Sequence, residues 1–461
     1  DRRRRRLPRA RGARHVVVAQ PPPRGIAGRA QPARGARRRH GVARSRHDGV
    51  DGERVDHHRG VGALGEAAMS IAIDTDLFRR LLAGVNEQGQ SADGWTRAPW
   101  TDELRAAERL VIEAATGMDW EYDAAGNLWI TDAAAPADGL VVTGSHLDTV
   151  PKGGAFDGTL GVVGGLVAVL ALRAAGVRGA ERLAVISFAD EEGSRFNTPC
   201  FGSRTMVGTF GDEVADMRDK DGISIREAGP KDPTAAAGLH RRIGAYYEIH
   251  VEQGLALDPA DVTLGIATRL SARGRWEWTV QGEANHAGTT PMAGRRDALV
   301  RAAEFVLAVQ RTALAHPGAV GTVGRLAPWP GGTNVIPGRV TGTLDVRALD
   351  NQTRDAVIRS LVEGFPDIEI EHKSTDDAAI FDPGLIADLH ASAAERGVSS
   401  MDLPSYAGHD AGTLALAGVP SVMVFTRSPN GISHNPAEHS DEDVCLAAVE
   451  VLAAAMARRL A

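Results

Sequence analysis

The chain has 461 residues, of which 43% are hydrophobic and 24% are charged, and its formal net charge is −7. This length predicts two or three domains, the composition is typical of a globular enzyme, and no run of about eighteen apolar residues predicts a membrane span. The two cysteines, Cys200 and Cys445, are far apart and lack metal-type spacing, which favours a reducing cytoplasm over the alternative of a disulfide.

The N-terminal segment, residues 1–68, differs from the rest of the chain. It holds 18 Arg, no Lys and six acidic residues, a charge of +12, which leaves −19 on the remainder. Its lack of apolar periodicity and its many Pro and Gly residues predict disorder. Binding to nucleic acid or an anionic membrane, a targeting segment and a mis-assigned start are the alternatives. We favour the last, with the true start at Met69, and expect no nucleic-acid or membrane partner.

Residues 69–267 alternate between amphipathic helices and apolar strands. Helices are predicted at 74–88 and 101–117, a strand at 139–150, a helix at 157–176 and a strand at 181–190. Apolar strands separated by a buried helix are typical of a mostly parallel sheet in an α/β domain. We therefore expect the first part of a catalytic domain here.

Residues 268–378 follow a different order of elements. The pattern predicts β-α-β-β-α-β, with elements at 274–284, 295–316, 318–328, 339–349, 351–365 and 368–374. This is a ferredoxin-like unit, and we expect it to be inserted into the first domain.

The α/β pattern returns in residues 379–461. Asp382 and Pro383 begin a helix, a strand follows at 418–427, and a terminal helix covers 440–460, where Ser440 and Asp443 resemble a capping box. The predicted fold class is α/β, with a mixed, mostly parallel sheet flanked by helices and interrupted by the ferredoxin-like unit.

Potential metal ligands occur where the predicted strands end. His146 lies at the carboxyl end of a strand, Asp148 follows it on the same face, and Asp157 begins the next helix. The carboxyl ends of parallel strands are where ligands gather. A core position for His146 and helix capping by Asp157 are the structural alternatives.

Other strand ends contribute Glu191, Glu192, His250 and His434. Imidazole and carboxylate ligands without thiolate suit Zn²⁺ or Mn²⁺. These candidates outnumber the protein ligands of one tetrahedral catalytic zinc. If one acid bridges, the set suits two metals about 3.5–4 Å apart.

Six longer motifs closely resemble the amidase/hydantoinase/carbamoylase family of dinuclear metal-dependent amidohydrolases. They are "GSHLDTVPKGGAFDGTLGVVGGL", "ADEEGSRF", "IHVEQG", "NHAGTTPM", "TNVIPG" and "GISHNPAEHS", and the resemblance covers about residues 73–460. The family contains N-carbamoyl-L-amino acid hydrolases, β-ureidopropionases and allantoate amidohydrolases, within the zinc aminopeptidase-like clan. The resemblance implies that the inserted unit is a lid and dimerisation domain.

The resemblance also implies a role for each metal-site candidate. His146 would bind one metal and Asp157 would bridge two. Glu192 would complete the coordination of one metal and His434 that of the other. His250 would be the remaining ligand. In addition, Glu191 would be the general base and later the general acid, and Asp148 would orient His146.

Further residues match the family's substrate contacts. His286 resembles the histidine that reaches the substrate oxyanion, often across a dimer interface, and Arg347 resembles a clamp for the substrate carboxylate. Asn334 would contact the substrate amide and Gln253 would donate to substrate. The structural alternatives are that His286 lies in a surface loop and that Arg347 is a solvated charge at a strand edge. For Asn334 the alternative is a turn residue, and for Gln253 a cap of the strand end.

His409 and Asp410 lie where a loop enters a helix. A helix N-terminus can hold a carboxylate, so we expect His409 to contact substrate and Asp410 to support it. Capping of the helix by Asp410 is the alternative.

The predicted activity is metal-dependent hydrolysis of the carbamoyl C–N bond of N-carbamoyl-L-amino acids or similar ureido acids. Two divalent ions are expected, Zn²⁺ or Mn²⁺, with Co²⁺ or Ni²⁺ as alternatives, in a cytoplasmic homodimer. Allantoate hydrolysis is the close alternative. Aminoacylase or dipeptidase activity and a non-catalytic binding protein are the others.

Overall fold

The computed structural model describes residues 71–461. The predictions for residues 1–68 and for a start at Met69 therefore lie outside the described part. Within it, no helix is both long and apolar enough to cross a membrane. Cys200 and Cys445 are buried free thiols, so the alternative of a disulfide is wrong.

The larger sheet is mixed, with a parallel centre. Its nine strands have the order β13-β8-β15-β7-β5-β6-β4-β3, with β14 paired to β8. The pairs β15/β7, β7/β5 and β5/β6 are parallel, and β4 and β3 continue antiparallel. The strands are β3 (Asp119–Tyr122), β4 (Leu128–Thr131), β5 (Leu140–His146), β6 (Leu183–Phe188), β7 (Ile243–Val251), β8 (Leu264–Leu270), β13 (Ala379–Ile380), β14 (Ser400–Ser405) and β15 (Ser421–Thr426).

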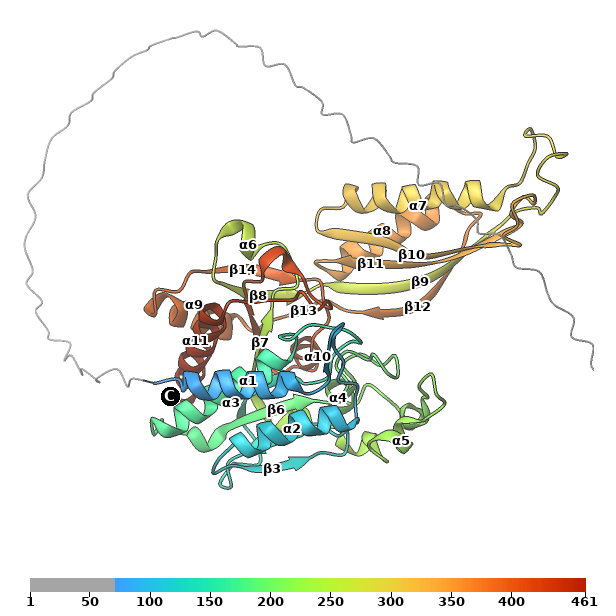
Figure 1. The fold of residues 1–461 in the computed structure, drawn as a ribbon. Coiled ribbons are helices and arrows are strands. Elements are labelled where there is room, and N and C mark those ends of the chain that lie inside the picture. The colour runs from blue at the N-terminus through green and yellow to red at the C-terminus, as the bar shows by residue number, and fades with distance from the viewer. Residues whose placement is uncertain (1–70) are drawn as a thin grey trace, which may run out of the picture. The chain divides into compact units, whose positions relative to one another are not determined.

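Helices cover both faces of this sheet, and the apolar side chains of its central strands alternate between two cores (Figure 1). On β5, Val141 belongs to one core and Val142 to the other, as a strand period of two requires. The first core includes side chains of α1 (Thr75–Glu87), α2 (Asp102–Ala114), α3 (Thr159–Ala174), α9 (Pro383–Glu395) and α11 (Glu442–Leu460). The second includes those of α4 (Phe201–Met206) and α10 (Asp410–Leu416).

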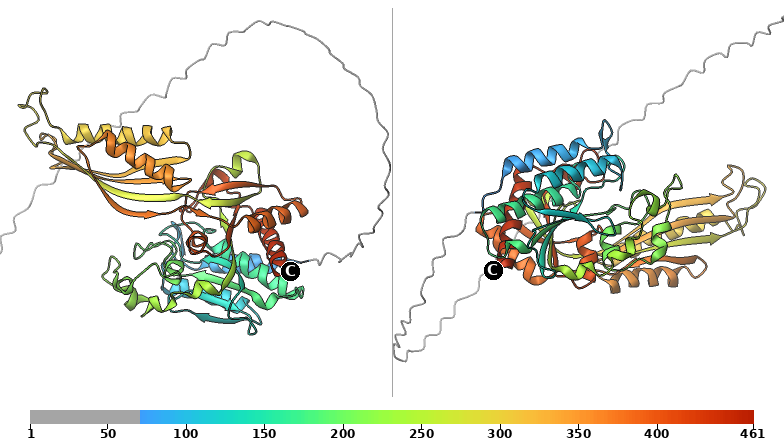
Figure 2. Two further views of the ribbon diagram at one scale, coloured as in Figure 1. Left: turned by 180° about the vertical axis from the view of Figure 1, so that it is seen from behind. Right: turned by 90° about the horizontal axis from the view of Figure 1, so that it is seen from below.

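The smaller sheet has four antiparallel strands in the order β10-β11-β9-β12. Its elements are β9 (Ala272–Gln281), α7 (Ala298–Ala315), β10 (Ala319–Trp329), β11 (Arg339–Ala348), α8 (Asn351–Gly364) and β12 (Glu369–Asp376). The two helices lie side by side on one face, where Trp278 and Phe305 form part of a separate core (Figures 1 and 2). The predicted β-α-β-β-α-β order is confirmed. We propose that this unit is the inserted domain expected at 268–378, between catalytic segments 69–267 and 379–461.

Some elements differ from those predicted. Strands β3 and β4 at one edge of the large sheet, and β8, β13 and β14 toward the other, were not predicted, since their sequences lack a long apolar run. The short elements β1 (Gln90–Ser91), β2 (Gly94–Trp95), α5 (Ile225–Ala228) and α6 (Leu257–Ala260) were also missed. The Ser440–Asp443 capping box is wrong: Asp441 is the N-cap of α11, and Ser440 Oγ instead donates to the carbonyl of Arg427 at 2.9 Å.

Candidate metal centre

The candidate ligands gather at the edge of the large sheet where its parallel strands end. His146 is the last residue of β5, and His250 is the last residue but one of β7. Asp157 precedes α3, Glu192 follows β6, and His434 follows β15. Thus segments far apart in the sequence deliver their polar side chains to one place.

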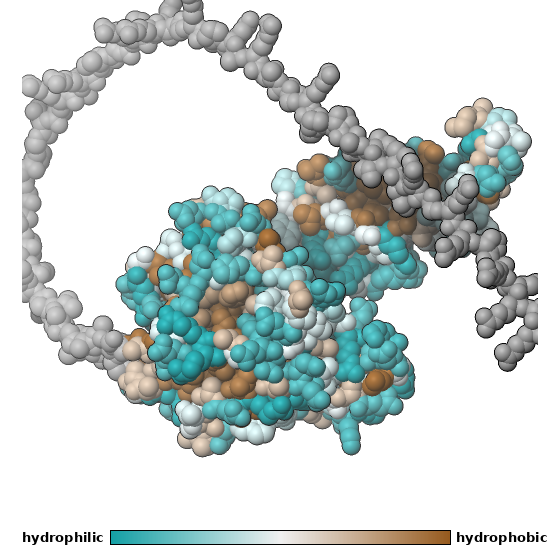
Figure 3. Space-filling view, viewed as in Figure 1, coloured by the Kyte–Doolittle hydropathy of each residue, from teal (hydrophilic) through white to brown (hydrophobic). Residues whose placement is uncertain are grey.

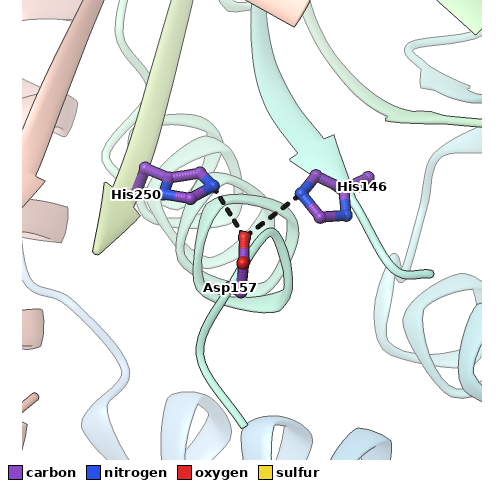
Figure 4. A group of neighbouring side chains, drawn as sticks. All are labelled: His146, Asp157 and His250. Carbon is purple, nitrogen blue, oxygen red and sulfur yellow. Dashed lines mark ion pairs between the residues drawn. The ribbon is translucent and has the colours of Figure 1, made fainter. Parts of the chain in front are cut away.

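Two imidazoles point at the same carboxylate oxygen of Asp157 (Figure 4). Asp157 Oδ1 lies 2.9 Å from Nε2 of His250 and 3.5 Å from Nε2 of His146. All three side chains are buried. Burial opposes ionisation of Asp157, but the surrounding histidines outweigh it and hold the pKa of this carboxyl well below its usual range. Asp157 is therefore a stable anion to which cations can bind.

The second oxygen of Asp157 belongs to another group of side chains. Nε2 of His434 lies 3.2 Å from Asp157 Oδ2 and 3.4 Å from Glu192 Oε2. The family resemblance had suggested Glu192 at one metal and His434 at the other, whereas here they share one group. Burial, reinforced by Asp157, raises the pKa of Glu192 to about 7.

These residues fit a pair of metal ions by their geometry and by their unpaired atoms. In each group, His146–Asp157–His250 and Asp157–Glu192–His434, the potential ligand atoms lie within 4.8 Å of one another. His146 Nε2 and Glu192 Oε1 are buried and have no hydrogen-bond partner among the described residues. Such atoms are costly to bury, and a divalent cation at each group would satisfy them.

The backbone fixes the imidazole tautomers that metal binding needs. Nδ1 of His146 lies 3.0 Å from the carbonyl oxygen of Asp148, and Nδ1 of His250 lies 2.9 Å from that of Val251. A carbonyl oxygen only accepts, so each Nδ1 carries the proton. In the neutral rings, Nε2 therefore presents its lone pair toward Asp157.

Asp157 is itself held by residues from two distant segments. Glu438 Oε1 accepts the backbone N–H groups of Phe156 and Asp157 at 2.8 and 2.9 Å. Gln253 Nε2 donates to Asp157 Oδ2 at 2.9 Å, and Ser433 Oγ donates to the same oxygen at 3.2 Å. Gln253, predicted to donate to substrate, also donates to Ser433 Oγ at 3.0 Å. Glu438 was not predicted.

Gly158 permits the close approach of Asp157 and His146. It is the N-cap of α3, with φ +63°, and a Cβ atom there would lie 2.4 Å from atoms of the His146 ring. The cap has no side-chain hydrogen bond, so the alternative of Asp157 as helix cap is wrong.

Asp148 contacts His146, the residue it is predicted to orient, through both its backbone and its side chain. Its carbonyl oxygen lies 3.0 Å from Nδ1 of His146, and its carboxylate Oδ1 lies 3.6 Å from the same nitrogen. The carboxylate accepts the backbone N–H groups of Glu191 and Glu192, both at 3.2 Å. Asp148 thus links the end of β5 to the loop after β6.

Glu191 lies beside the candidate metal ligands without belonging to either group. Its Oε2 is 3.8 Å from Nε2 of His146, and its Oε1 accepts a hydrogen bond from Cys200 Sγ at 3.4 Å. Burial raises the pKa of Glu191 well above its usual range; His146 opposes this rise, while Asp410 reinforces it. A carboxyl with a raised pKa is suited to accept and return a proton near neutral pH.

A cavity of about 440 Å³ joins these residues to the smaller sheet. It is lined by Asp157, Glu191, Glu192, His250 and His434 together with His409 and the arginines Arg273, Arg275 and Arg347. The cavity therefore places carboxylates and imidazoles opposite a cluster of cationic side chains.

The comparisons with known proteins agree with one another. The model of peptidase family M20/M25/M40 matches residues 142–458. The chain belongs to this family. It is 38% identical to an N-carbamoyl-L-amino acid amidohydrolase of Geobacillus stearothermophilus, over 82% of this chain and 96% of the relative. It is 32% identical to an allantoate deiminase of Arabidopsis thaliana, over 80% of each chain.

A solved structure agrees with the fold. A hydantoinase/carbamoylase family amidase from Burkholderia multivorans superposes with a TM-score of 0.75 at 33% identity, over 84% of this chain and 98% of the other. The M20/M25/M40 family is metal-dependent, and the described residues of this member contain three candidate ligand groups. Two of them share Asp157, and the third consists of Glu248, His250 and His409. The predicted resemblance to hydantoinase/carbamoylase amidases is confirmed.

The predicted substrate residues of this M20/M25/M40 member are only partly brought to the cavity. Arg347 lines it, but its guanidinium already donates to Asp345 at 2.9 Å and to the carbonyl of Tyr406 at 2.6 Å. His286 and Asn334 are exposed and do not line it. They lie together, since the N–H of Ala287 donates to the carbonyl of Asn334 at 2.9 Å.

The start of α10 holds a carboxylate that was not predicted. His409 is the buried N-cap and makes no capping hydrogen bond through its side chain. Glu248 Oε2 accepts the N–H of Ala411 at 3.1 Å, and Asp410 accepts from Ser203 Oγ. The alternative of Asp410 as helix cap is therefore wrong. A charged residue within the apolar strand β7, two positions before His250, was the available signal for Glu248.

Proposed function

We propose that the protein hydrolyses the carbamoyl C–N bond of N-carbamoyl-L-amino acids or related ureido acids. The observation that carries this proposal is Glu191, a buried carboxylate beside two candidate metal groups in a cavity that also holds arginines. The names of the relatives, an N-carbamoyl-L-amino acid amidohydrolase and an allantoate deiminase, support it.

We further propose that His146, Asp157 and His250 hold one divalent ion and that Asp157, Glu192 and His434 hold a second. Zn²⁺ or Mn²⁺ suits these ligands, with Co²⁺ or Ni²⁺ as alternatives. Such ions polarise a carbonyl oxygen and lower the pKa of water, which supplies the Lewis acidity of the reaction.

Glu191 performs the proton transfers in this proposal. It takes a proton from the attacking water and then gives it to the nitrogen that leaves as the amine of the amino acid. The carbamic acid released on the other side decomposes to ammonia and carbon dioxide. The raised pKa of Glu191 matches both steps, because one group must be base and then acid.

His286 is prepared to donate a hydrogen bond to the developing oxyanion. Its Nδ1 accepts the N–H groups of Gly288 and Thr289 at 3.0 and 3.1 Å. The ring proton of the neutral form is therefore on Nε2, which is free to donate. In this proposal, Asn334 contacts the substrate beside it, and Arg347 holds the α-carboxylate.

We propose that His286 reaches the cavity of a second subunit in a homodimer. On α7, Val300, Leu307 and Leu314 are 58%, 54% and 80% exposed, and their spacing of seven places them on one stripe of the helix. Figure 3 shows hydrophobic residues at the surface of the smaller-sheet unit. Strand β10 is an edge of the smaller sheet, so its outer backbone groups are open to pairing. An exposed apolar stripe beside an open edge favours an interface between two copies.

Allantoate hydrolysis is the second candidate, supported by the allantoate deiminase relative. Allantoate also carries a carboxylate beside ureido groups, so the same cavity serves both substrates. The family is named for peptidases, but the names of these two relatives favour a ureido acid over the substrate of an aminoacylase or dipeptidase, and favour an enzyme over a non-catalytic binding protein. The two buried free thiols fit the proposed cytoplasmic location.

The test is an ammonia-release assay on the full chain with added Zn²⁺ or Mn²⁺. N-carbamoyl-L-amino acids, N-carbamoyl-β-alanine and allantoate are compared as substrates. We expect metal-dependent release from at least one class of ureido acid. Absence of ammonia release with every metal and every substrate would overturn the proposed function.

A further inference from the structure

Three arginines of the smaller sheet face the candidate metal centre. Arg273 and Arg275 lie on β9 and Arg347 lies on β11, and all three line the cavity. In the register, Arg347 is paired with Arg273 and Asp345 with Arg275. Because side chains alternate along a strand, these four share one face of the sheet.

Two of these arginines are already committed to partners within the chain. Arg273 donates to Asp376 Oδ2 through Nε and a terminal nitrogen, at 2.8 and 2.6 Å. Arg347 donates to Asp345 Oδ1 at 2.9 Å and to the carbonyl of Tyr406 at 2.6 Å. Their positions are therefore fixed before substrate arrives.

Arg275 is the exception. Its side chain is 49% exposed, and its one side-chain hydrogen bond within the described residues is a long one, from Nε to Asp345 Oδ2 at 3.4 Å. Asp345 already pairs with Arg347, so one carboxylate stands between two guanidinium groups and leaves a positive charge in excess. The terminal N–H groups of Arg275 form a planar fork, the geometry that binds a carboxylate through two hydrogen bonds.

The remainder of the cavity wall is polar. Among the described residues that line it there is no leucine, isoleucine, valine, methionine, phenylalanine or tryptophan. Pro199, Cys200 and Ala407 are its largest apolar contributions beyond glycine. Ligand sites are usually lined mainly by apolar side chains, so an aliphatic or aromatic substrate side chain would gain little by entering this one.

We propose that Arg275 binds a second carboxylate of the substrate, so that the preferred substrates are ureido dicarboxylic acids, the N-carbamoyl derivatives of acidic L-amino acids. Arg347 then holds the α-carboxylate and Arg275 the carboxylate of the side chain. This inference rests on the proposed carbamoyl hydrolysis and specifies its substrate class. A substrate with one carboxylate would leave the excess positive charge at Arg275 unpaired.

The experiment compares isosteric pairs of substrates. kcat/KM is measured on the metal-loaded full chain for N-carbamoyl-L-aspartate against N-carbamoyl-L-asparagine, and for N-carbamoyl-L-glutamate against N-carbamoyl-L-glutamine. We expect the acidic member to be preferred by about tenfold or more, the scale of a hydrogen bond to a charged group. Allantoate, measured alongside, should have a lower kcat/KM than the preferred acidic substrate.

Three variants assign the preference to Arg275. Arg275→Gln should abolish it by raising KM for the acidic substrates far more than for the neutral ones. Arg275→Lys should keep part of it, since the charge remains without the fork. Lys373→Gln is the control: it removes one positive charge from a residue of the same sheet that pairs with Glu277 and does not line the cavity.

Equal kcat/KM within each pair in the wild type would overturn this inference, as would an equal loss on both members in Arg275→Gln. A higher kcat/KM on allantoate than on every acidic substrate would also overturn it. In each of these outcomes ureido acids are still hydrolysed, so the proposed function survives. Absence of turnover on every ureido acid would instead remove the proposed function.

Discussion

The carboxylate of Asp148 accepts a hydrogen bond from the backbone N–H of Glu191 at 3.2 Å. The same carboxylate accepts the N–H of Glu192, so one side chain fixes the backbone that carries both glutamates. The two side chains nevertheless reach different places. Glu191 approaches His146 and Cys200, whereas Glu192 approaches His434. Adjacent residues of the same type should therefore respond differently to the same substitution.

Glu191→Gln should retain bound metal and lose nearly all turnover. The amide preserves the shape of the side chain and cannot accept the proton of the attacking water. The expected loss in kcat is about 10²–10⁴-fold, the usual contribution of a general acid–base group. Metal content is measured by mass spectrometry and kcat by ammonia release. Substantial residual turnover would show that another residue is the base.

Glu192→Gln should instead lose metal. Its Oε1 is buried without a partner, and its Oε2 faces His434, which is the arrangement expected of a ligand. Removing the charge weakens the second ion, so the metal content should fall from about two toward about one per chain. The matched comparison is Glu191→Gln, prepared and analysed identically. Full occupancy in Glu192→Gln would contradict its role as a ligand.

The ligands were predictable because strand ends are encoded locally. The apolar runs of β5 and β6 mark where His146 and the two glutamates leave the sheet, and a period of two assigns their faces. The supports of Asp157 were not predictable in this way. Glu438 and Gln253 lie 281 and 96 positions away in the chain, and nothing near either residue in sequence indicates the contact.

The same distinction applies to the smaller sheet. The order of its elements followed from their periodicity, and Arg347 followed from the family resemblance. Arg275 has no motif of its own. Its importance comes from the register that places it opposite Asp345, and from the fact that Asp345 is already paired with Arg347. Pairing of this kind exists only in the folded sheet, so the sequence alone does not indicate it.

Gly158→Ala should abolish metal binding at the His146 group. A Cβ atom at Gly158 would lie 2.4 Å from the His146 ring, so the imidazole must leave its place beside Asp157. Gly176→Ala is the matched control. Gly176 follows the other end of the same helix with a similar φ of +65°, but a Cβ atom there would meet nothing within 4 Å.

Both alanine variants carry the strain of a left-handed backbone, about 1–2 kcal/mol of unfolding free energy. Only Gly158→Ala carries the clash with the imidazole. Thermal unfolding with and without Zn²⁺ separates the two effects. Zn²⁺ should raise the Tm of the control as much as that of the wild type, and should raise that of Gly158→Ala much less. An equal rise in both variants would show that the steric contact is not needed for metal binding.

Leu307→Glu should convert the proposed dimer into monomers. Leu307 is the middle residue of the exposed stripe on α7, and a carboxylate there would be buried without a partner in an interface between two copies. The control is Val362→Glu on α8, which is 46% exposed and lies off that stripe. Sedimentation velocity measures the mass. If His286 acts across the interface, the monomer should also lose turnover while keeping its metal, because the donor to the oxyanion is then absent. A monomeric wild type, or a fully active monomeric variant, would contradict the shared site.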